Sequence, residues 1–117
     1  MRYRRCVAAS LAVLGVSVGA VGCGFNRPSG ITEADRTGPY REAVQLYLNG
    51  CNSCHGDNLE GGVGPSLAKV GDRLTEAELV RRIADGGGPM PAYGPDGQGI
   101  LTPAQIQLLA SWLATKK

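Results

Sequence analysis

Two cysteines and a histidine stand close together near the middle of the chain, in the run Cys51-Asn52-Ser53-Cys54-His55. Two thiols at this spacing can each form a thioether bond with a vinyl group of a haem. The histidine that follows can bind the iron through an imidazole nitrogen. This C-x-x-C-H run therefore predicts one c-type haem, attached covalently through Cys51 and Cys54, with His55 as an axial ligand.

Other uses of the cysteine pair fit the rest of the chain less well. A thioredoxin-like redox motif occurs beside a βαβ pattern, and no such pattern surrounds residues 51–55. A zinc site needs about four nitrogen or sulfur ligands, but His55 is the only histidine, and the other cysteines are Cys6 and Cys23. A disulfide between residues so close in sequence would be strained.

Met90 is the candidate for the second axial ligand. It is the only methionine after Met1, and it lies in a glycine-rich loop between Pro89 and Pro91. The prolines restrict the backbone on both sides, and the chain has no second histidine. We therefore expect the Met90 thioether to bind the iron opposite His55, a ligand pair that raises the reduction potential of a haem.

A carbonyl group is expected to orient the histidine. Pro65 ends the glycine-rich stretch that follows His55, and its carbonyl oxygen is free to accept a hydrogen bond from the second ring nitrogen of His55. Such a bond fixes the imidazole ring and raises its basicity. Leu67 and Val70 would line the haem pocket or belong to the ordinary apolar core.

The N-terminal segment, residues 1–22, predicts an export signal or an uncleaved membrane anchor. Three arginines within residues 1–5 precede an uncharged, mostly apolar run, Cys6–Phe25. Its end, Ala20-Val21-Gly22-Cys23, resembles a bacterial lipoprotein box, with cleavage before Cys23 and lipid on its sulfur. Two alternatives remain: cleavage after the small residues Val18–Ala20, or retention of a run long enough to span a bilayer.

The remaining chain divides into a spacer and one domain. Residues 23–38 predict a lipid-attachment cysteine and a flexible linker, because glycine, proline and polar residues show no sustained apolar period. Part of this stretch could instead pack as an N-terminal arm. Residues 39–117 predict a single monohaem domain. Residues 23–117 carry nine Lys or Arg and ten Asp or Glu, and the absence of a basic stripe argues against nucleic acid binding.

Three helices are predicted in the domain. The first covers Pro39–Asn49, and the second runs from a Thr75 cap to about Asp85. The third begins after Thr102 and ends near two lysines, Lys116 and Lys117, which suit the negative end of the helix dipole. Trp112, the only tryptophan, would pack either at the crossing with the first helix or near the haem edge.

Residues 38–117 resemble the class I cytochrome c family. Leu46–Gly56 is similar to its first helix and haem site, Gly64–Leu67 to its proline segment, Gly88–Pro91 to its methionine loop and Leu101–Leu113 to its closing helix. The resemblance implies an all-α fold, with helices wrapped round one covalent haem and crossing N- and C-terminal helices. The lipoprotein box adds a similarity to small membrane-attached cytochromes of Gram-positive bacteria.

The resemblance implies a function as well. We expect a monomeric single-electron carrier, not an enzyme, tethered at the outer face of the cytoplasmic membrane. Its redox partners would be a quinol-oxidising complex and a terminal oxidase. The alternative is a haem protein in which Met90 is labile or unbound, acting as a gas sensor or peroxidase. Peroxide cleavage usually needs a distal base, and no second histidine is present.

Overall fold

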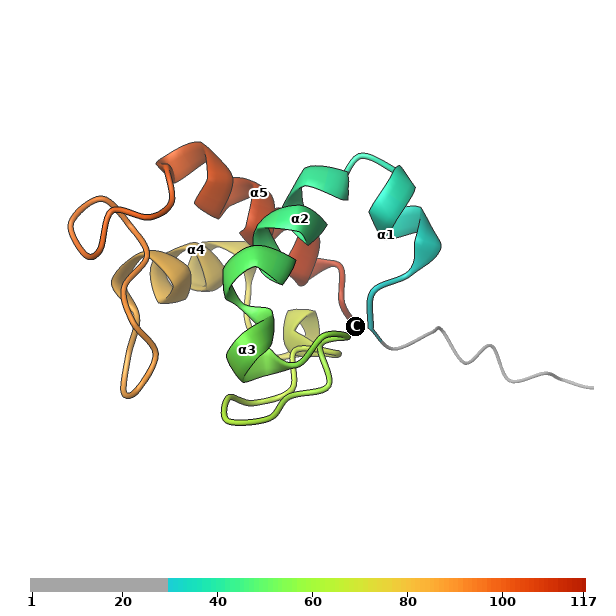
Figure 1. Ribbon diagram of the computed structural model, residues 1–117, viewed down its shortest axis with the longest axis horizontal. Coiled ribbons are helices and arrows are strands. Elements are labelled where there is room, and N and C mark those ends of the chain that lie inside the picture. The colour runs from blue at the N-terminus through green and yellow to red at the C-terminus, as the bar shows by residue number, and fades with distance from the viewer. Residues whose placement is uncertain (1–29) are drawn as a thin grey trace, which may run out of the picture.

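The computed structural model of the protein describes residues 30–117, which fold into five α-helices and one short 3-10 helix. No β-strand occurs among these residues, so the all-α prediction is confirmed for them. No helix in this range is long and apolar enough to cross a membrane. The elements are α1 (Glu33–Thr37), α2 (Arg41–Gly50), α3 (Asn52–His55), η1 (Val70–Asp72), α4 (Glu76–Asp85) and α5 (Pro103–Ala114) (Figure 1).

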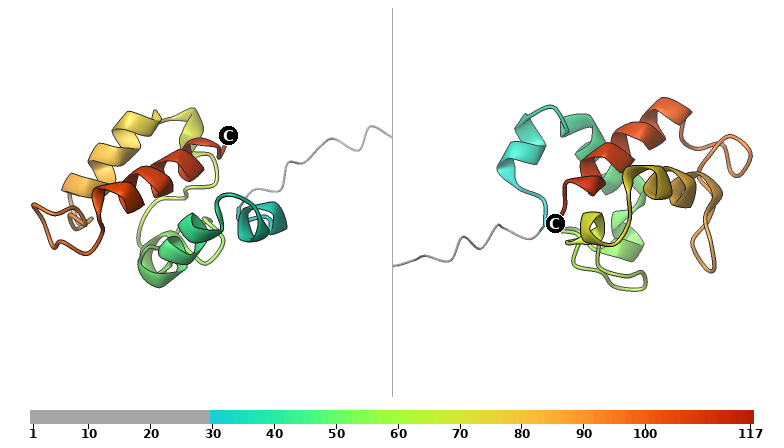
Figure 2. Two further views of the ribbon diagram at one scale, coloured as in Figure 1. Left: turned by 90° about the horizontal axis from the view of Figure 1, so that it is seen from above. Right: turned by 180° about the vertical axis from the view of Figure 1, so that it is seen from behind.

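The C-terminal helix is the centre of the fold. α5 lies between α2 and α4 and contacts both (Figure 2). The expected crossing of the terminal helices is therefore formed by α2 and α5. Apolar side chains from these three helices, the loop after α3 and η1 make one core, which consists of Ala43, Val44, Tyr47, Leu59, Val70, Leu79, Ile83, Ile106, Leu109, Ala110, Trp112 and Leu113.

The predicted starts of α4 and α5 and the predicted end of α4 are confirmed, whereas α5 ends at Ala114, before the two lysines expected at its end. Thr75 caps α4 in a capping box with Glu78, and Gly86, with φ of 70°, ends the helix. Thr102 and Gln105 form the same motif at the start of α5, with a proline at the first position. These reciprocal side-chain bonds satisfy backbone N–H groups that have no partner inside a helix. α2 covers Arg41–Gly50, close to the range predicted for the first helix.

Trp112 occupies the first of its two expected places. Its side chain is fully buried, and its ring meets the ring of Tyr47 edge-on, with 5.6 Å between the centroids. Tyr47 lies on α2, so Trp112 packs at the crossing of α2 and α5. Edge-to-face contacts of this kind add to the stabilisation from apolar burial.

Residues 30–38 differ from the flexible linker predicted for residues 23–38. They form a packed arm that contains α1, and a capping box between Thr32 and Asp35 starts the helix. The reason is a contact that sequence pattern does not reveal. Lys116, expected to end the third helix and interact with its dipole, instead lies beyond α5 and is buried, with its Nζ 2.6 Å from Asp35 Oδ2. The predictions for residues 1–29, including Cys23, lie outside the described residues.

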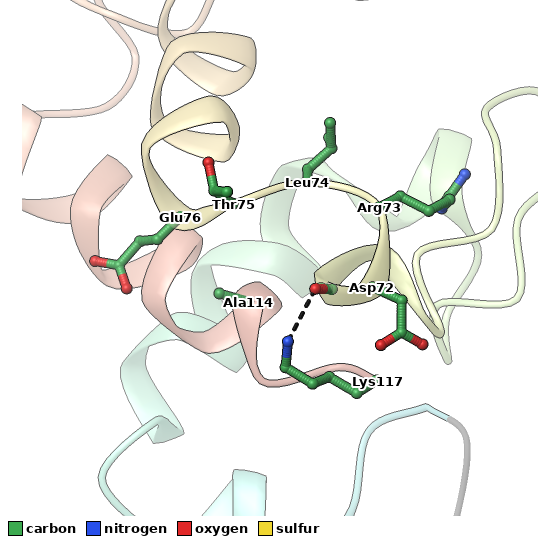
Figure 3. A pocket seen from close by; sticks show the side chains of 8 residues that line it. Asp72, Arg73, Leu74, Thr75, Glu76, Ala114 and Lys117 are labelled. Atoms are coloured by element: carbon green, nitrogen blue, oxygen red, sulfur yellow. Dashed lines mark hydrogen bonds between the residues drawn. The ribbon is translucent and has the colours of Figure 1, made fainter.

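A shallow groove of about 230 Å³ separates η1 and the start of α4 from the end of the chain (Figure 3). The Nζ atom of Lys117 donates a 3.0 Å hydrogen bond to the Gly71 carbonyl at its edge. None of the residues singled out by the sequence for haem binding lines this groove. The candidate site is therefore on another part of the molecule.

Candidate haem-binding site

The two cysteines of the C-x-x-C-H run lie at the junction of α2 and α3. Cys51 is both the C-cap of α2 and the N-cap of α3, and Cys54 lies within the single turn of α3. Both thiols are free; Cys51 is half-buried and Cys54 is exposed. Burial, followed by the proximity of Cys54, raises the pKa of the Cys51 thiol to about 11. The short helix thus presents two unpaired thiols beside the core.

His55 makes the hydrogen bond that the sequence predicts. Its Nδ1 atom lies 2.8 Å from the carbonyl oxygen of Pro65. A carbonyl only accepts, so Nδ1 carries the proton and donates. The neutral ring then keeps Nε2 unprotonated and able to bind a metal. The contact is present, and the ligand role of His55 that it supports stays a prediction.

The glycine-rich loop that precedes Pro65 packs closely against the His55 ring at Gly64. A Cβ atom on Gly64 would lie only 2.9 Å from His55 Cε1 and 3.0 Å from Nδ1. The Gly64 amide donates a 2.7 Å bond to the Cys54 carbonyl, and the Gly61 amide donates a 2.7 Å bond to the His55 carbonyl. Glycine at position 64 therefore allows the loop to carry Pro65 to the ring.

Tyr47 is a residue of the site that no sequence motif marks. Its hydroxyl donates a 2.6 Å hydrogen bond to the carbonyl of Gly56, directly after His55. Burial, followed by the charges of Cys51 and Glu60, raises the pKa of the Tyr47 phenol well above its usual value. The available signal was the residue type, because a buried tyrosine needs a partner for its hydroxyl.

Met90 lies in a tight loop after α4. Its amide donates to the Gly87 carbonyl at 3.1 Å, and its carbonyl accepts from the Gly87 amide at 3.0 Å. Gly86, Gly87 and Gly88 all have positive φ, which allows this narrow turn. The Met90 side chain is half-buried and packs against the core. In Figure 1 this loop and α3 both lie on the lower side of the molecule, whereas α1 lies at the upper right.

Tyr93 fastens the methionine loop to α4. Its amide donates a 3.1 Å bond to the Ile83 carbonyl, which ties the loop back to α4. Burial, followed by the charges of Cys51 and Cys54, raises the pKa of the Tyr93 phenol. Tyr93 is half-buried and packs against the same apolar core as Cys51. No sequence motif marks Tyr93 as part of the site.

These features fit a covalent haem. The thiols are unpaired, as thioether formation requires, and the imidazole is oriented by a carbonyl with one nitrogen left for iron. Met90 and Cys51 are both half-buried and pack against the one apolar core. Sulfur and imidazole ligands are those used by c-type haems. Cys51, Cys54, His55 and Met90 are therefore the residues that would hold it.

Comparisons with known proteins agree with this site. A family model described as "Cytochrome C oxidase, cbb3-type, subunit III" matches residues 38–113. Cytochrome c-551 of Bacillus subtilis (strain 168) is 34% identical over 107 residues, which cover 87% of this chain and 88% of that protein. The match therefore spans almost the whole of both chains.

Two further relatives match over shorter ranges. The menaquinol:cytochrome c reductase cytochrome c subunit of Geobacillus thermodenitrificans is 54% identical over 43 residues, which cover 37% of this chain and 16% of that protein. Among solved structures, the c-type cytochrome NirC has a TM-score of 0.53 and 30% identity, covering 63% of this chain and 86% of that one. The chain therefore belongs to the cytochrome c family, as a small class I monohaem member with haem c bound covalently through Cys51 and Cys54.

Proposed function

We propose that the protein carries single electrons, with His55 and Met90 as the two axial ligands of its haem iron. The observation that carries this proposal is the 2.8 Å contact from His55 Nδ1 to the Pro65 carbonyl, because it orients the ring and leaves Nε2 for the metal. When bound, the haem supplies one-electron oxidation and reduction at its iron. With both axial positions filled by the protein, small molecules are kept from the metal.

The chain's own residues set the potential at which an electron is gained or lost. The Pro65 carbonyl raises the basicity of His55, whereas a soft thioether from Met90 favours the reduced iron and raises the potential. Tyr93 and Cys51 exclude water from part of the site, since both are at least half-buried. No step requires a proton or a substrate to be held, so we propose a carrier and not an enzyme.

The proposed partners are a quinol-oxidising complex as electron donor and a terminal oxidase as acceptor. The local 54% identity to a menaquinol:cytochrome c reductase subunit and the family model named for an oxidase subunit support this pair. The reductase subunit is named for the quinol-oxidising end of a respiratory chain, and the family model for the oxidase end. The protein would act as a monomer in brief encounters, which small and weak interfaces permit.

We further propose that the protein is exported and works at the outer face of a bacterial cytoplasmic membrane. Cys23, near the end of the apolar run Cys6–Phe25, would carry the lipid. Retention of the run Cys6–Phe25 as an anchor is the rival form of attachment. In either form a membrane partner is encountered repeatedly, because tethering raises the effective concentration.

Optical spectra of the exported haem protein test the ligand proposal. We expect low-spin spectra in the ferric and ferrous states, and a methionine–iron charge-transfer band at the red end of the visible spectrum of the ferric protein. The spectrum of the ferrous protein should not change when carbon monoxide is added. A high-spin ferric form that binds carbon monoxide on reduction would contradict Met90 ligation. It would favour the rival function of gas sensing or peroxidase chemistry at an open iron.

A further inference from the structure

One buried carboxylate joins the two ends of the described chain. Asp35 is 8% exposed. Its Oδ1 accepts a 2.9 Å bond from Trp112 Nε1, and its Oδ2 accepts a 2.6 Å bond from Lys116 Nζ. Thr32 donates to Oδ2 through both its amide and its hydroxyl, each at 2.8 Å. We call Asp35, Trp112 and Lys116 the latch, and residues 30–37 the arm.

The first two residues of the arm, Gly30 and Ile31, also form hydrogen bonds with the domain. Lys116 Nζ also donates to the Gly30 carbonyl at 3.1 Å, and the Ile31 amide donates to Asn58 Oδ1 at 2.8 Å. Gly30 has a φ of 114°, and a Cβ atom there would lie 2.5 Å from the side-chain Nδ2 atom of Asn58. The arm therefore begins at one defined point, between Asn58 and Lys116.

The arm depends on the latch for its order. α1 has only five residues, and a helix this short is not stable in water on its own. Apolar burial by the arm is limited to Ile31, which packs against the core, because Glu33, Ala34, Arg36 and Thr37 face solvent. Removing one partner of a buried ion pair leaves the other charge uncompensated. Loss of either charge should therefore release the arm.

The start of the arm is remote from the loop that carries Met90. In Figure 1 the arm and the C-terminus lie on one side of α2, and the loop after α4 lies on the other; the rear view in Figure 2 shows the same separation. Gly30, where the arm begins, therefore lies on the side away from the methionine loop. The latch holds the arm on this side.

We propose that the latch limits the reach of the haem domain from its membrane attachment, an inference that rests on the proposed attachment at or near Cys23. With the arm docked, residues 24–29 alone span the distance from Cys23 to the domain, at most about 20 Å at roughly 3.4 Å per residue. With the arm released, residues 24–37 could extend to about 48 Å. Asp35, Trp112 and Lys116 are thus positioning residues that keep the domain close to the membrane.

Hydrogen exchange tests whether the latch holds the arm. In the holoprotein, Asp35→Asn and Lys116→Met should speed exchange of the amides of residues 35–38 at least tenfold, while the amides of α4 keep their wild-type rates. Lys117→Met is the matched control, because Lys117 bonds to Gly71 and does not touch the arm. Unchanged exchange in the arm, or an equal rise in α4, would overturn the latch as a separate unit.

Energy transfer tests the effect on reach. The lipid-bearing holoprotein is placed in vesicles of phosphatidylglycerol and phosphatidylethanolamine that contain a headgroup-labelled fluorescent lipid, which the haem quenches. We expect quenching by the Asp35→Asn variant to be at least twofold weaker than by wild type or Lys117→Met at equal bound protein. Equal quenching by all three would overturn the limit on reach.

The two experiments separate the latch from the attachment on which it rests. A wild-type protein that stays in solution would overturn the membrane attachment, and with it the limit on reach. The hydrogen exchange of residues 35–38 would still decide whether Asp35 fastens the arm. Equal quenching with all variants bound would instead retain the attachment and reject the proposed role of the latch.

Discussion

The hydroxyl of Tyr47 donates a 2.6 Å hydrogen bond to the carbonyl oxygen of Gly56, the residue that directly follows His55. Tyr47 lies on α2, one helical turn before Cys51, and its side chain is fully buried. The bond therefore fastens the end of α3 to α2. Through this bond the core of the fold acts on the backbone of the proposed haem ligand.

Replacing Tyr47 with Phe should lower the free energy of unfolding by about 1 to 2 kcal/mol, because the Gly56 carbonyl loses its donor in a partly buried position. Guanidinium unfolding of the ferric holoprotein, followed by circular dichroism, measures the change. Tyr40→Phe is the control, since the Tyr40 hydroxyl makes no hydrogen bond within residues 30–117. Equal stability of the two variants would mean that the Tyr47 hydroxyl contributes nothing.

Gly64→Ala should displace the His55 ring, because the new Cβ atom would lie 2.9 Å from Cε1. A weaker bond from Nδ1 to Pro65 makes the imidazole less basic. The reduction potential should then rise by about 20 to 60 mV, a two- to tenfold change in the one-electron equilibrium constant. Spectroelectrochemical titration measures it.

The matched control for Gly64 is in the same loop. At Gly62 a Cβ atom would meet only the Cys54 carbonyl oxygen, at an ordinary 3.4 Å, and the Gly62 φ is not positive. Gly62→Ala should therefore leave the potential at its wild-type value. If the two alanine variants had the same potential, the contact between Gly64 and His55 would have no influence on the haem.

Asp35 should contribute stability that acid removes. Burial by itself would raise the pKa of this carboxyl, but the hydrogen bonds from Lys116, Thr32 and Trp112 outweigh it and lower the pKa from 3.8 to about 2. The contribution, roughly 2 kcal/mol, is complete above pH 4 and is lost as the pH falls through the folded-state value near 2.

Unfolding curves between pH 7 and pH 2 check this window. Wild type should be more stable than Asp35→Asn by about 3 kcal/mol at pH 7, because the variant leaves Lys116 buried without its counter-charge. The difference should shrink between pH 4 and pH 2. Asp96→Asn, at an exposed loop position, should follow the wild-type curve. A difference that does not vary with pH would reject the lowered pKa.

Met90→Ala should lower the reduction potential by at least about 60 mV, a tenfold change in the one-electron equilibrium constant, because the thioether that favours the ferrous iron is gone. The reduced variant should also bind carbon monoxide. Pro91→Ala disturbs the same loop without removing the sulfur and should do neither. An unchanged potential in Met90→Ala would eliminate Met90 as a ligand.

Cys23→Ala should release the protein from membranes if Cys23 carries the lipid. Fractionation of cells into membrane and soluble material, followed by haem staining, measures the distribution. Cys6→Ala is the control, because Cys6 lies at the start of the apolar run and outside the lipoprotein box. Retention of Cys23→Ala in washed membranes at high salt would favour an uncleaved anchor over Cys6–Phe25.

Local sequence signals were sufficient for the starts of α4 and α5 and for the haem motif, but α1, α3 and the end of α5 were not predicted. Thr75 and Thr102 each precede a partner three residues on, and a capping box acts between neighbours in sequence. The spacing of Cys51, Cys54 and His55 likewise needs only one turn of backbone to place both thiols. The His55 to Pro65 bond also joins positions within a single short loop.

Contacts between distant residues could be decided only by the tertiary structure. Asp35 and Lys116 lie at opposite ends of the domain, and each alone reads as an exposed charge; packing of the arm on α5 buries both and turns a predicted linker into part of the fold. In the same way, the crossing of α2 and α5 places the Trp112 ring against the ring of Tyr47. The sequence by itself determined which chemistry Cys51, Cys54 and His55 can perform, because that chemistry depends on residue types within one turn. Only the folded chain decided which side chains support them, because burial and ion pairing depend on segments that meet across the core.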